Sequence, residues 1–176
     1  MGGGSLKVEL NAIPDEKTPI ALTFHPYFNL NAFGAIDNHS LYINASKITK
    51  VDSEMVANGD IILTTNTPYD FSENKVIGSY PYDINYLLNG NFAAKAISNE
   101  SGVVMEIYTN QKGLQFYTAN ELNTKSGKTG AYSPRAGFCL EPQNYANDVN
   151  IKSFPSPFVE NGESYIWQAE YKFKTI

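Results

Sequence analysis

The chain has 176 residues, of which 42% are hydrophobic and 18% are charged, as is typical of one globular domain and not of a disordered chain. Its formal net charge is -5 and no basic patch stands out, so we expect no nucleic-acid partner. The single cysteine, Cys139, excludes an internal disulfide. One cysteine and two histidines, His25 and His39, do not form a zinc-site pattern, so we expect no metal.

The ends of the chain and its apolar runs give expectations about location. No apolar run is long enough to span a membrane, so we expect no membrane partner. The first residues lack the pattern of a secretory signal, and we therefore expect a cytoplasmic protein. Residues 1–5 read MGGGS, which resembles a tag or linker, and the domain is expected to cover residues 6–176.

Strand patterns recur along the whole chain. Alternation of apolar and polar residues predicts half-buried strands, and short apolar runs predict buried ones. Segments 92–97 and 103–108 are separated by Asn-Glu-Ser-Gly, which predicts a hairpin. In chain order, the predicted strands are residues 6–10, 40–44, 61–65 (read as buried), 92–97, 103–108, 114–118, 137–141 and 165–173.

The predicted fold class is all-β. No long run of residues has apolar side chains at helical spacing, and glycine and proline punctuate the chain often. Many short strands with such turns favour an antiparallel sandwich or barrel. Residues 120–134 are polar, and we expect them to form a mobile loop or to lie near the mouth of a site.

Three titratable residues are candidates for chemistry, although each also has an ordinary structural interpretation. Glu141 ends an apolar run, where a carboxylate must be paired or shift its pKa, unless it points to solvent at a strand end. His25 lies among apolar and aromatic residues, as a satisfied core histidine also would. Asp83 lies among tyrosines, where capping of a turn explains an aspartate as well as substrate contact does.

The order and wording of whole segments carry more information than these single residues. Together they resemble the aldose 1-epimerase (galactose mutarotase) family, whose segments include His-x-Tyr-Phe-Asn-Leu and Gly-Phe-Cys-Leu-Glu-Thr-Gln. The resemblance runs in order over nearly the whole chain and corresponds to the C-terminal half of the family's domain. It rests on residues 22–30 (LTFHPYFNL), 67–71 (TPYDF), 82–86 (YDINY), 113–120 (GLQFYTAN), 137–143 (GFCLEPQ), 147–150 (NDVN) and 154–156 (FPS).

The resemblance implies an antiparallel β-sandwich of the galactose mutarotase type, incomplete here, and an isomerase that interconverts the α and β anomers of a free hexose such as galactose or glucose. Glu141 matches the family's catalytic base and His25 its catalytic acid, a role that suits a side chain titrating near neutrality. Asp83 and Gln115 match residues that hydrogen-bond sugar hydroxyls. Such acid–base chemistry requires no cofactor.

The aromatic residues near His25 and the family's cysteine have less specific interpretations. Tyr27 and Phe28 are candidates for an apolar wall against the sugar, with core packing as the alternative. Cys139 is interpreted as core packing and not as a nucleophile, since no paired histidine is evident in the sequence.

Departures from the family leave alternatives open. Ile84 stands where the family often has histidine, and the family's N-terminal half, which supplies an arginine and a second histidine, has no counterpart in the resemblance. The chain is therefore expected to be a truncated enzyme, to associate with itself or with a second chain, or to be a non-catalytic carbohydrate-binding module. A hexose-phosphate epimerase would need a basic cluster, for which Lys125, Lys128 and Arg135 are weak candidates.

Overall fold

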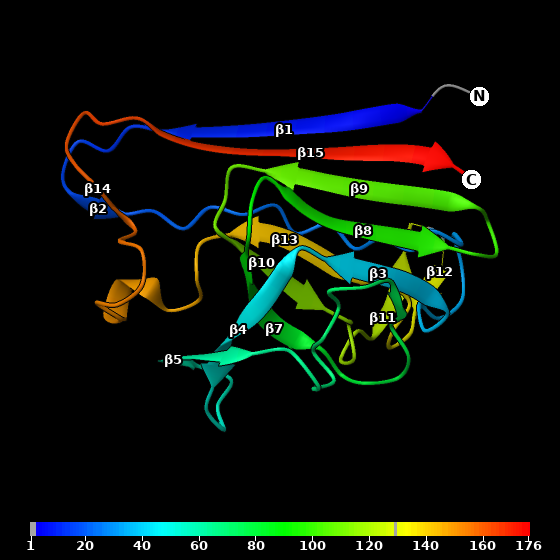
Figure 1. Ribbon diagram of the computed structural model, residues 1–176. Coiled ribbons are helices and arrows are strands. Elements are labelled where there is room, and N and C mark those ends of the chain that lie inside the picture. Colours follow the sequence, from blue (N-terminus) through cyan, green and yellow to red (C-terminus); the bar gives the residue numbers. More distant parts are fainter. Residues whose placement is uncertain (1–2, 129) are drawn as a thin grey trace.

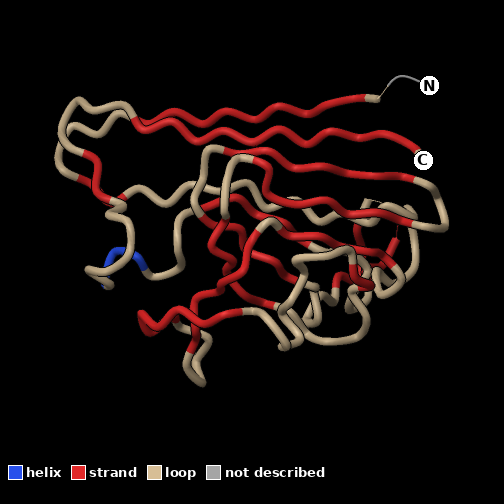
Figure 2. Tube along the Cα trace, in the orientation of Figure 1, coloured by secondary structure: helices blue, strands red, loops and turns tan. Residues whose placement is uncertain are grey.

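The computed structural model describes residues 3–128 and 130–176, and these residues form two antiparallel sheets around one core (Figure 1). Strands and loops account for nearly all of the described chain, and the helical structure within it is one short 3₁₀ turn (Figure 2). The all-β, antiparallel prediction is therefore confirmed. None of the described helical structure has the length and apolar character needed to cross a membrane.

The larger sheet has six strands, with β1 at one edge and β6 at the other. The long strand β15 shows why the sequence forms it: Trp167, Ala169 and Tyr171 are buried, while the residues between them are more exposed. In spatial order the strands are β1 (Gly4–Ala12), β15 (Tyr165–Thr175), β9 (Val103–Thr109), β8 (Phe92–Ser98), β3 (His39–Ile43) and β6 (Lys75–Val76).

The smaller sheet has five strands and carries the residues of chemical interest. Its spatial order is β13 (Cys139–Gln143), β10 (Gly113–Tyr117), β7 (Asp83–Leu88), β4 (Ala45–Val51) and β5 (Ala57–Leu63). Two short pairs and one turn complete the described elements: β11 (Thr124–Gly127) with β12 (Gly130–Tyr132), β14 (Phe158–Val159) with β2 (Thr18–Pro19), and the 3₁₀ turn η1 (Asp148–Asn150).

The two sheets share one hydrophobic core. Trp167 and Tyr171 of the larger sheet and Phe116 and Leu140 of the smaller one are all fully buried in it. The Trp167 Nε1–H donates a hydrogen bond of 2.8 Å to the carbonyl oxygen of Pro142 in β13, so one side chain ties the layers together. Pro142 follows Glu141 in the sequence, so this hydrogen bond helps to fix the position of the strand that carries Glu141.

The predicted strands occur largely where the alternation placed them. The hairpin of β8 and β9 is confirmed, and Gly102 in its turn has a φ of 71°, a conformation that favours glycine. The prediction that residues 61–65 form a buried strand is wrong in its burial. Ile61, Ile62 and Leu63 end β5 at the edge of the smaller sheet and are 45%, 38% and 62% exposed.

Two further segments differ from expectation. Within residues 120–134, predicted as a loop, β11 and β12 form a small antiparallel pair with a register shift. Near the N-terminus, Gly4 and Ser5 pair with Phe173 and Lys172 as part of β1. Met1 and Gly2 lie outside the described residues, and the origin of residues 1–5 as a tag or linker stays a prediction.

Candidate active site

A polar face on the smaller sheet brings the predicted residues together. In register, Gln115 of β10 lies opposite Asn85 of β7 on one side and Glu141 of β13 on the other. Because side chains alternate along a strand, Asp83 shares the face of Asn85, whereas Ile84 points into the core. Asp83, Gln115 and Glu141 therefore lie on the face that is turned away from the core.

His25 reaches this face from a segment that runs along β13. Phe28 and Phe138 form an antiparallel bridge through two backbone hydrogen bonds of 2.8 and 2.9 Å. Further along, the Thr23 hydroxyl donates to the carbonyl oxygen of Pro142. In an antiparallel pairing, each step back from Phe28 matches one step forward from Phe138, and three steps place His25 beside Glu141.

The His25–Glu141 pair is the chemical centre of the face. The Nε2 atom of His25 lies 3.2 Å from Oε1 of Glu141. The histidine side chain is 47% exposed and the glutamate side chain 6% exposed, so a half-exposed ring contacts a buried carboxyl group. Burial, together with the negative charge of nearby Asp83, raises the pKa of Glu141 to about 7. A carboxyl group with such a pKa exchanges protons readily at neutral pH.

Asp83 and Gln115 form a second polar pair beside the first. The Nε2–H of Gln115 donates a hydrogen bond of 2.7 Å to Oδ1 of Asp83. Among the described residues, the Oε1 atom of Gln115 and the Oδ1 atom of Asn85 are buried without a hydrogen-bond partner. Unpaired buried acceptors are costly, and a ligand hydroxyl is one kind of donor that could satisfy them after a small shift. Sequence reasoning missed Asn85, although its spacing of two residues from Asp83 could have indicated it.

The two aromatic candidates have different surroundings. Tyr27 is 49% exposed, and its ring centroid lies 5.2 Å from that of His25, so it borders the site. Phe28 packs against Phe138 and Tyr171, so it belongs to the packed interior. Of the two predicted wall residues, only Tyr27 lies at the site.

A cavity adjoins the site at Tyr27. Its volume is about 650 Å³, within the range of small-molecule sites in proteins. It lies between the segment after His25 and the β11–β12 pair, and its lining includes Phe33, Leu122 and Gly137. A second cavity, of about 460 Å³, is lined by residues of β1, β9 and β15 such as Lys7 and Tyr108. None of its lining residues belongs to the polar face, so we do not assign it to this site.

Cys139 lies on the polar face with Glu141, two residues along β13. It is fully buried, as core packing predicts, but ring nitrogen, sulfur and carboxylate oxygen of His25, Cys139 and Glu141 all lie within 4.8 Å of one another. The structure therefore places a histidine near this cysteine, which was not evident in the sequence. Burial raises the pKa of the Cys139 thiol well above its ordinary value, so the sulfur is protonated and is a poor nucleophile.

His39 is the structural histidine of the chain. It is fully buried; its Nε2 accepts a hydrogen bond from the Leu30 N–H, and its Nδ1 lies 3.1 Å from the Ile36 carbonyl oxygen. This arrangement fits a neutral ring with the proton on Nδ1. Burial lowers the pKa of His39, which also favours the neutral form.

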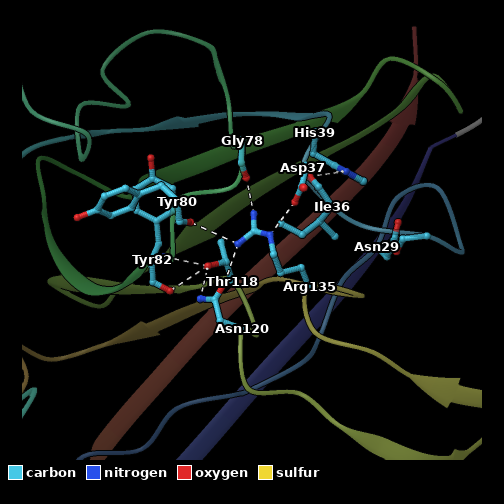
Figure 3. Close-up of polar contacts among 11 residues, drawn as sticks. Asn29, Ile36, Asp37, His39, Gly78, Tyr80, Tyr82, Thr118, Asn120 and Arg135 are labelled. Carbon is cyan, nitrogen blue, oxygen red and sulfur yellow. Dashed lines mark hydrogen bonds and ion pairs between the residues drawn. The ribbon is translucent and has the colours of Figure 1, made fainter.

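Arg135 has a structural position too, although it was a weak candidate for phosphate binding. Figure 3 shows its guanidinium enclosed by residues from several loops. Its Nε–H donates to Asp37 at 2.7 Å, and its side chain is 14% exposed. The remaining partners are the Asn120 side chain and the carbonyl oxygens of Gly78 and Tyr80. With its donors used in this way, Arg135 is not available to a phosphate group.

Comparison with known proteins agrees with this fold. The chain superimposes on the crystal structure of an aldose epimerase homologue from C. elegans with a TM-score of 0.93 at 24% identity, covering 98% of this chain and 56% of that one. It also matches a galactose 1-epimerase structure from Lactobacillus acidophilus with a TM-score of 0.84 at 24% identity, over 97% and 53% of the two chains. The fold is thus that of the galactose mutarotase-like β-sandwiches.

Sequence comparison carries the assignment further. Residues 2–172 match the family model described as aldose 1-epimerase. The chain is 37% identical to galactose mutarotase of Sus scrofa over 94% of its length and 53% of that protein. It is 36% identical to galactose mutarotase of Homo sapiens, over 98% and 55% of the two chains. The chain belongs to the aldose 1-epimerase family, and it spans a little over half the length of these relatives.

The raised pKa of Glu141 predicts a measurable titration. Replacing Asp83 with Asn removes a negative charge that disfavours the ionised form of Glu141, so the pKa of Glu141 should fall below about 7. It should stay above the ordinary value because burial, the larger cause, remains. Carbon NMR of the glutamate carboxyl groups over a pH series measures both values. An unchanged pKa in Asp83→Asn would show that the two carboxylates do not interact.

The same shift makes the stability of the fold depend on pH. Between the ordinary glutamate pKa of 4.5 and about 7, the folded chain binds more protons at Glu141 than the unfolded chain does. The contribution of this residue to the free energy of unfolding should therefore fall as pH rises through that window. Urea unfolding at several pH values tests the sign, with Glu141→Gln as the control in which this part of the slope disappears.

Proposed function

We propose that this chain carries the acid–base site of an aldose 1-epimerase acting on a free hexose such as galactose or glucose. The observation that supports it most is the contact between the buried carboxyl group of Glu141 and the half-exposed ring of His25, 3.2 Å apart. The names of the relatives, galactose mutarotase and aldose 1-epimerase, agree with this substrate class.

The proposed reaction needs two proton transfers. The carboxylate of Glu141 accepts the proton of the anomeric hydroxyl while protonated His25 donates a proton to the ring oxygen, and the bond between C1 and that oxygen breaks. The open aldehyde rotates about the C1–C2 bond, and ring closure on either face reverses both transfers. The anomeric and ring oxygens are both bonded to C1, so an adjacent base and acid can serve them together.

The remaining residues of the face would hold the sugar in place. Asp83 and Gln115 offer a carboxylate and an amide to the hydroxyl groups, and their mutual hydrogen bond fixes their orientation before a sugar arrives. Tyr27 presents an exposed ring beside His25, suited to the C–H face of a pyranose. Because a missing hydroxyl would leave a polar group unpaired, this arrangement supports selectivity among sugars.

A carbohydrate-binding module without catalysis is the second candidate function. The observation in its favour is the share of the relatives that the chain covers, 53% and 55% for the pig and human mutarotases. The part of a relative that this chain does not cover can carry groups that position the sugar. Without such groups, the polar face can bind a sugar without holding it in the geometry that ring opening needs. A hexose-phosphate epimerase is supported less, because Arg135 is already engaged with Asp37 and Asn120.

Association with a second chain, or with another copy, is a further proposal. Ile61, Ile62 and Leu63 at the exposed end of β5 offer an unpaired apolar edge to a partner strand. Figure 1 shows β5 projecting from the body of the fold. We also propose that the protein acts in the cytoplasm.

Polarimetry tests the proposed function. Freshly dissolved α-galactose and α-glucose are followed with and without the purified chain, and the proposal predicts a faster decay of rotation with protein. Methyl β-galactoside, which cannot open its ring, should slow this decay by competition. Decay equal to that in buffer, together with binding of the methyl glycoside by ligand-observed NMR, would favour the binding module and overturn the catalytic proposal.

A further inference from the structure

Three side chains of different ligand chemistry converge at one end of the polar face. Cys139 and Glu141 point to the same side of β13, and His25 is brought to them by the segment bridged at Phe28 and Phe138. One ligand atom from each of His25, Cys139 and Glu141 lies within 4.8 Å of the other two. The histidine is distant in sequence from the other two residues, which is why no zinc-site spacing is visible in the chain.

The separations are close to those a bound zinc ion needs. Zinc bonds of about 2.0–2.3 Å in a tetrahedral site place neighbouring ligand atoms about 3.5 Å apart. Nε2 of His25 and Oε1 of Glu141 are already 3.2 Å apart, and one ligand atom from each of the three residues lies within 4.8 Å of the other two, so a small contraction would bring all three around one ion. The half-exposed ring of His25 can follow such a movement, whereas Cys139 and Glu141 are fixed on a strand within the sheet.

The chemistry of the donors selects the kind of cation. Sulfur and imidazole nitrogen favour Zn²⁺ over Mg²⁺ and Ca²⁺, which prefer oxygen ligands. The carboxylates of Glu141 and nearby Asp83 add negative charge, which attracts a cation to this face. His25 is 47% exposed, so a fourth ligand can reach the ion from solvent.

We infer that His25, Cys139 and Glu141 form a binding site for Zn²⁺, with water as the fourth ligand. Binding replaces the thiol proton, which passes to solvent as the zinc–sulfur bond forms. The ion is then coordinated by the lone pairs of Glu141 and His25, so these two groups can no longer accept or donate protons. If the proposed function holds, Zn²⁺ is therefore an inhibitor of anomer interconversion, and the metal-free chain is the active form.

Cobalt provides a probe that does not depend on activity. Co²⁺ bound to a thiolate gives a sulfur-to-metal absorption band in the near ultraviolet, and Cys139 is the only cysteine of the chain. The wild-type chain should show this band with one Co²⁺ per chain, and Zn²⁺ should displace it. Cys139→Ala should lose the band, and His25→Gln should weaken Zn²⁺ binding at least tenfold. Glu54→Gln, at an exposed carboxylate in the β4–β5 turn, should behave as wild type.

The outcomes separate this site from the proposed function. Circular dichroism establishes that each variant is folded, and His25→Gln, at a half-exposed side chain, keeps the test informative if Cys139→Ala does not fold. No cobalt band in the wild type, or equal Zn²⁺ affinity in His25→Gln, would overturn the metal site. If the chain binds Zn²⁺ but does not speed mutarotation when it is metal-free, the inferred metal site stands and only the proposed function is contradicted.

Discussion

Glu141→Gln is expected to reduce the mutarotation rate above that of buffer by about 10²–10⁴-fold, the usual contribution of a general base. Glutamine keeps the shape of the side chain but cannot accept the proton of the anomeric hydroxyl as a carboxylate does. Because Glu141 is 4% exposed, the neutral side chain should also be well tolerated by the fold. In the wild type, protonation of Glu141 should remove the base, so the rate should fall as pH is lowered below about 7.

The rates are measured by polarimetry with α-galactose over a pH series. Glu163→Gln, a change at an exposed carboxylate near the end of the chain, is the matched control and should leave the rate unchanged. A Glu141→Gln variant that is folded and keeps the wild-type rate would show that this carboxyl group is not the base. A rate that does not fall as pH is lowered below about 7 would assign the base of the limiting step to another group.

Trp167→Ala is expected to lower the free energy of unfolding by about 3–5 kcal/mol, as large-to-small changes of buried aromatic residues do. The indole is fully buried and lies in the core shared by the two sheets. Its loss also removes the 2.8 Å hydrogen bond to the Pro142 carbonyl oxygen, next to Glu141. The variant should therefore weaken both the fold and the position of β13.

Trp167→Phe is the control that separates packing from hydrogen bonding. It keeps most of the apolar contact, and the Thr23 hydroxyl still donates to Pro142, so the loss should be smaller than for alanine. Urea unfolding is followed by circular dichroism, because Trp167 is the only tryptophan and its fluorescence is lost in both variants. Equal losses for alanine and phenylalanine would show that the hydrogen bond, and not the packing, dominates.

Alternation of apolar and polar residues was sufficient to predict most of the fold. It succeeded for β15 and for the β8–β9 hairpin, where one face of each strand meets the core. It missed β4 and β7, two inner strands of the smaller sheet. In β7, Asp83 and Asn85 on the polar face made the segment look like a turn among tyrosines. It misjudged the burial of β5, since a run of apolar residues does not reveal that its strand lies at a sheet edge.

Resemblance supplied the candidate residues of the site, but the geometry of these residues could not be predicted from the sequence. The roles of Glu141 and His25 came from matching segments, whereas their 3.2 Å contact depends on a segment pairing with β13 far along the chain. The same long-range pairing put His25 beside Cys139, which sequence spacing had given no reason to expect. Arg135 likewise appeared to be a loop charge until the structure showed its contacts with Asp37 and Asn120 (Figure 3).

The most direct test of the central claim is exchange NMR on an equilibrium mixture of galactose labelled with carbon-13 at C1. This measurement observes both directions of anomer interconversion at once, without a fresh anomer. With metal-free wild-type chain, we expect exchange between the α and β C1 signals at a rate that rises in proportion to protein concentration and is lost in Glu141→Gln. Exchange equal to that in buffer, from folded protein that binds the sugar, would contradict the claim that this chain interconverts anomers.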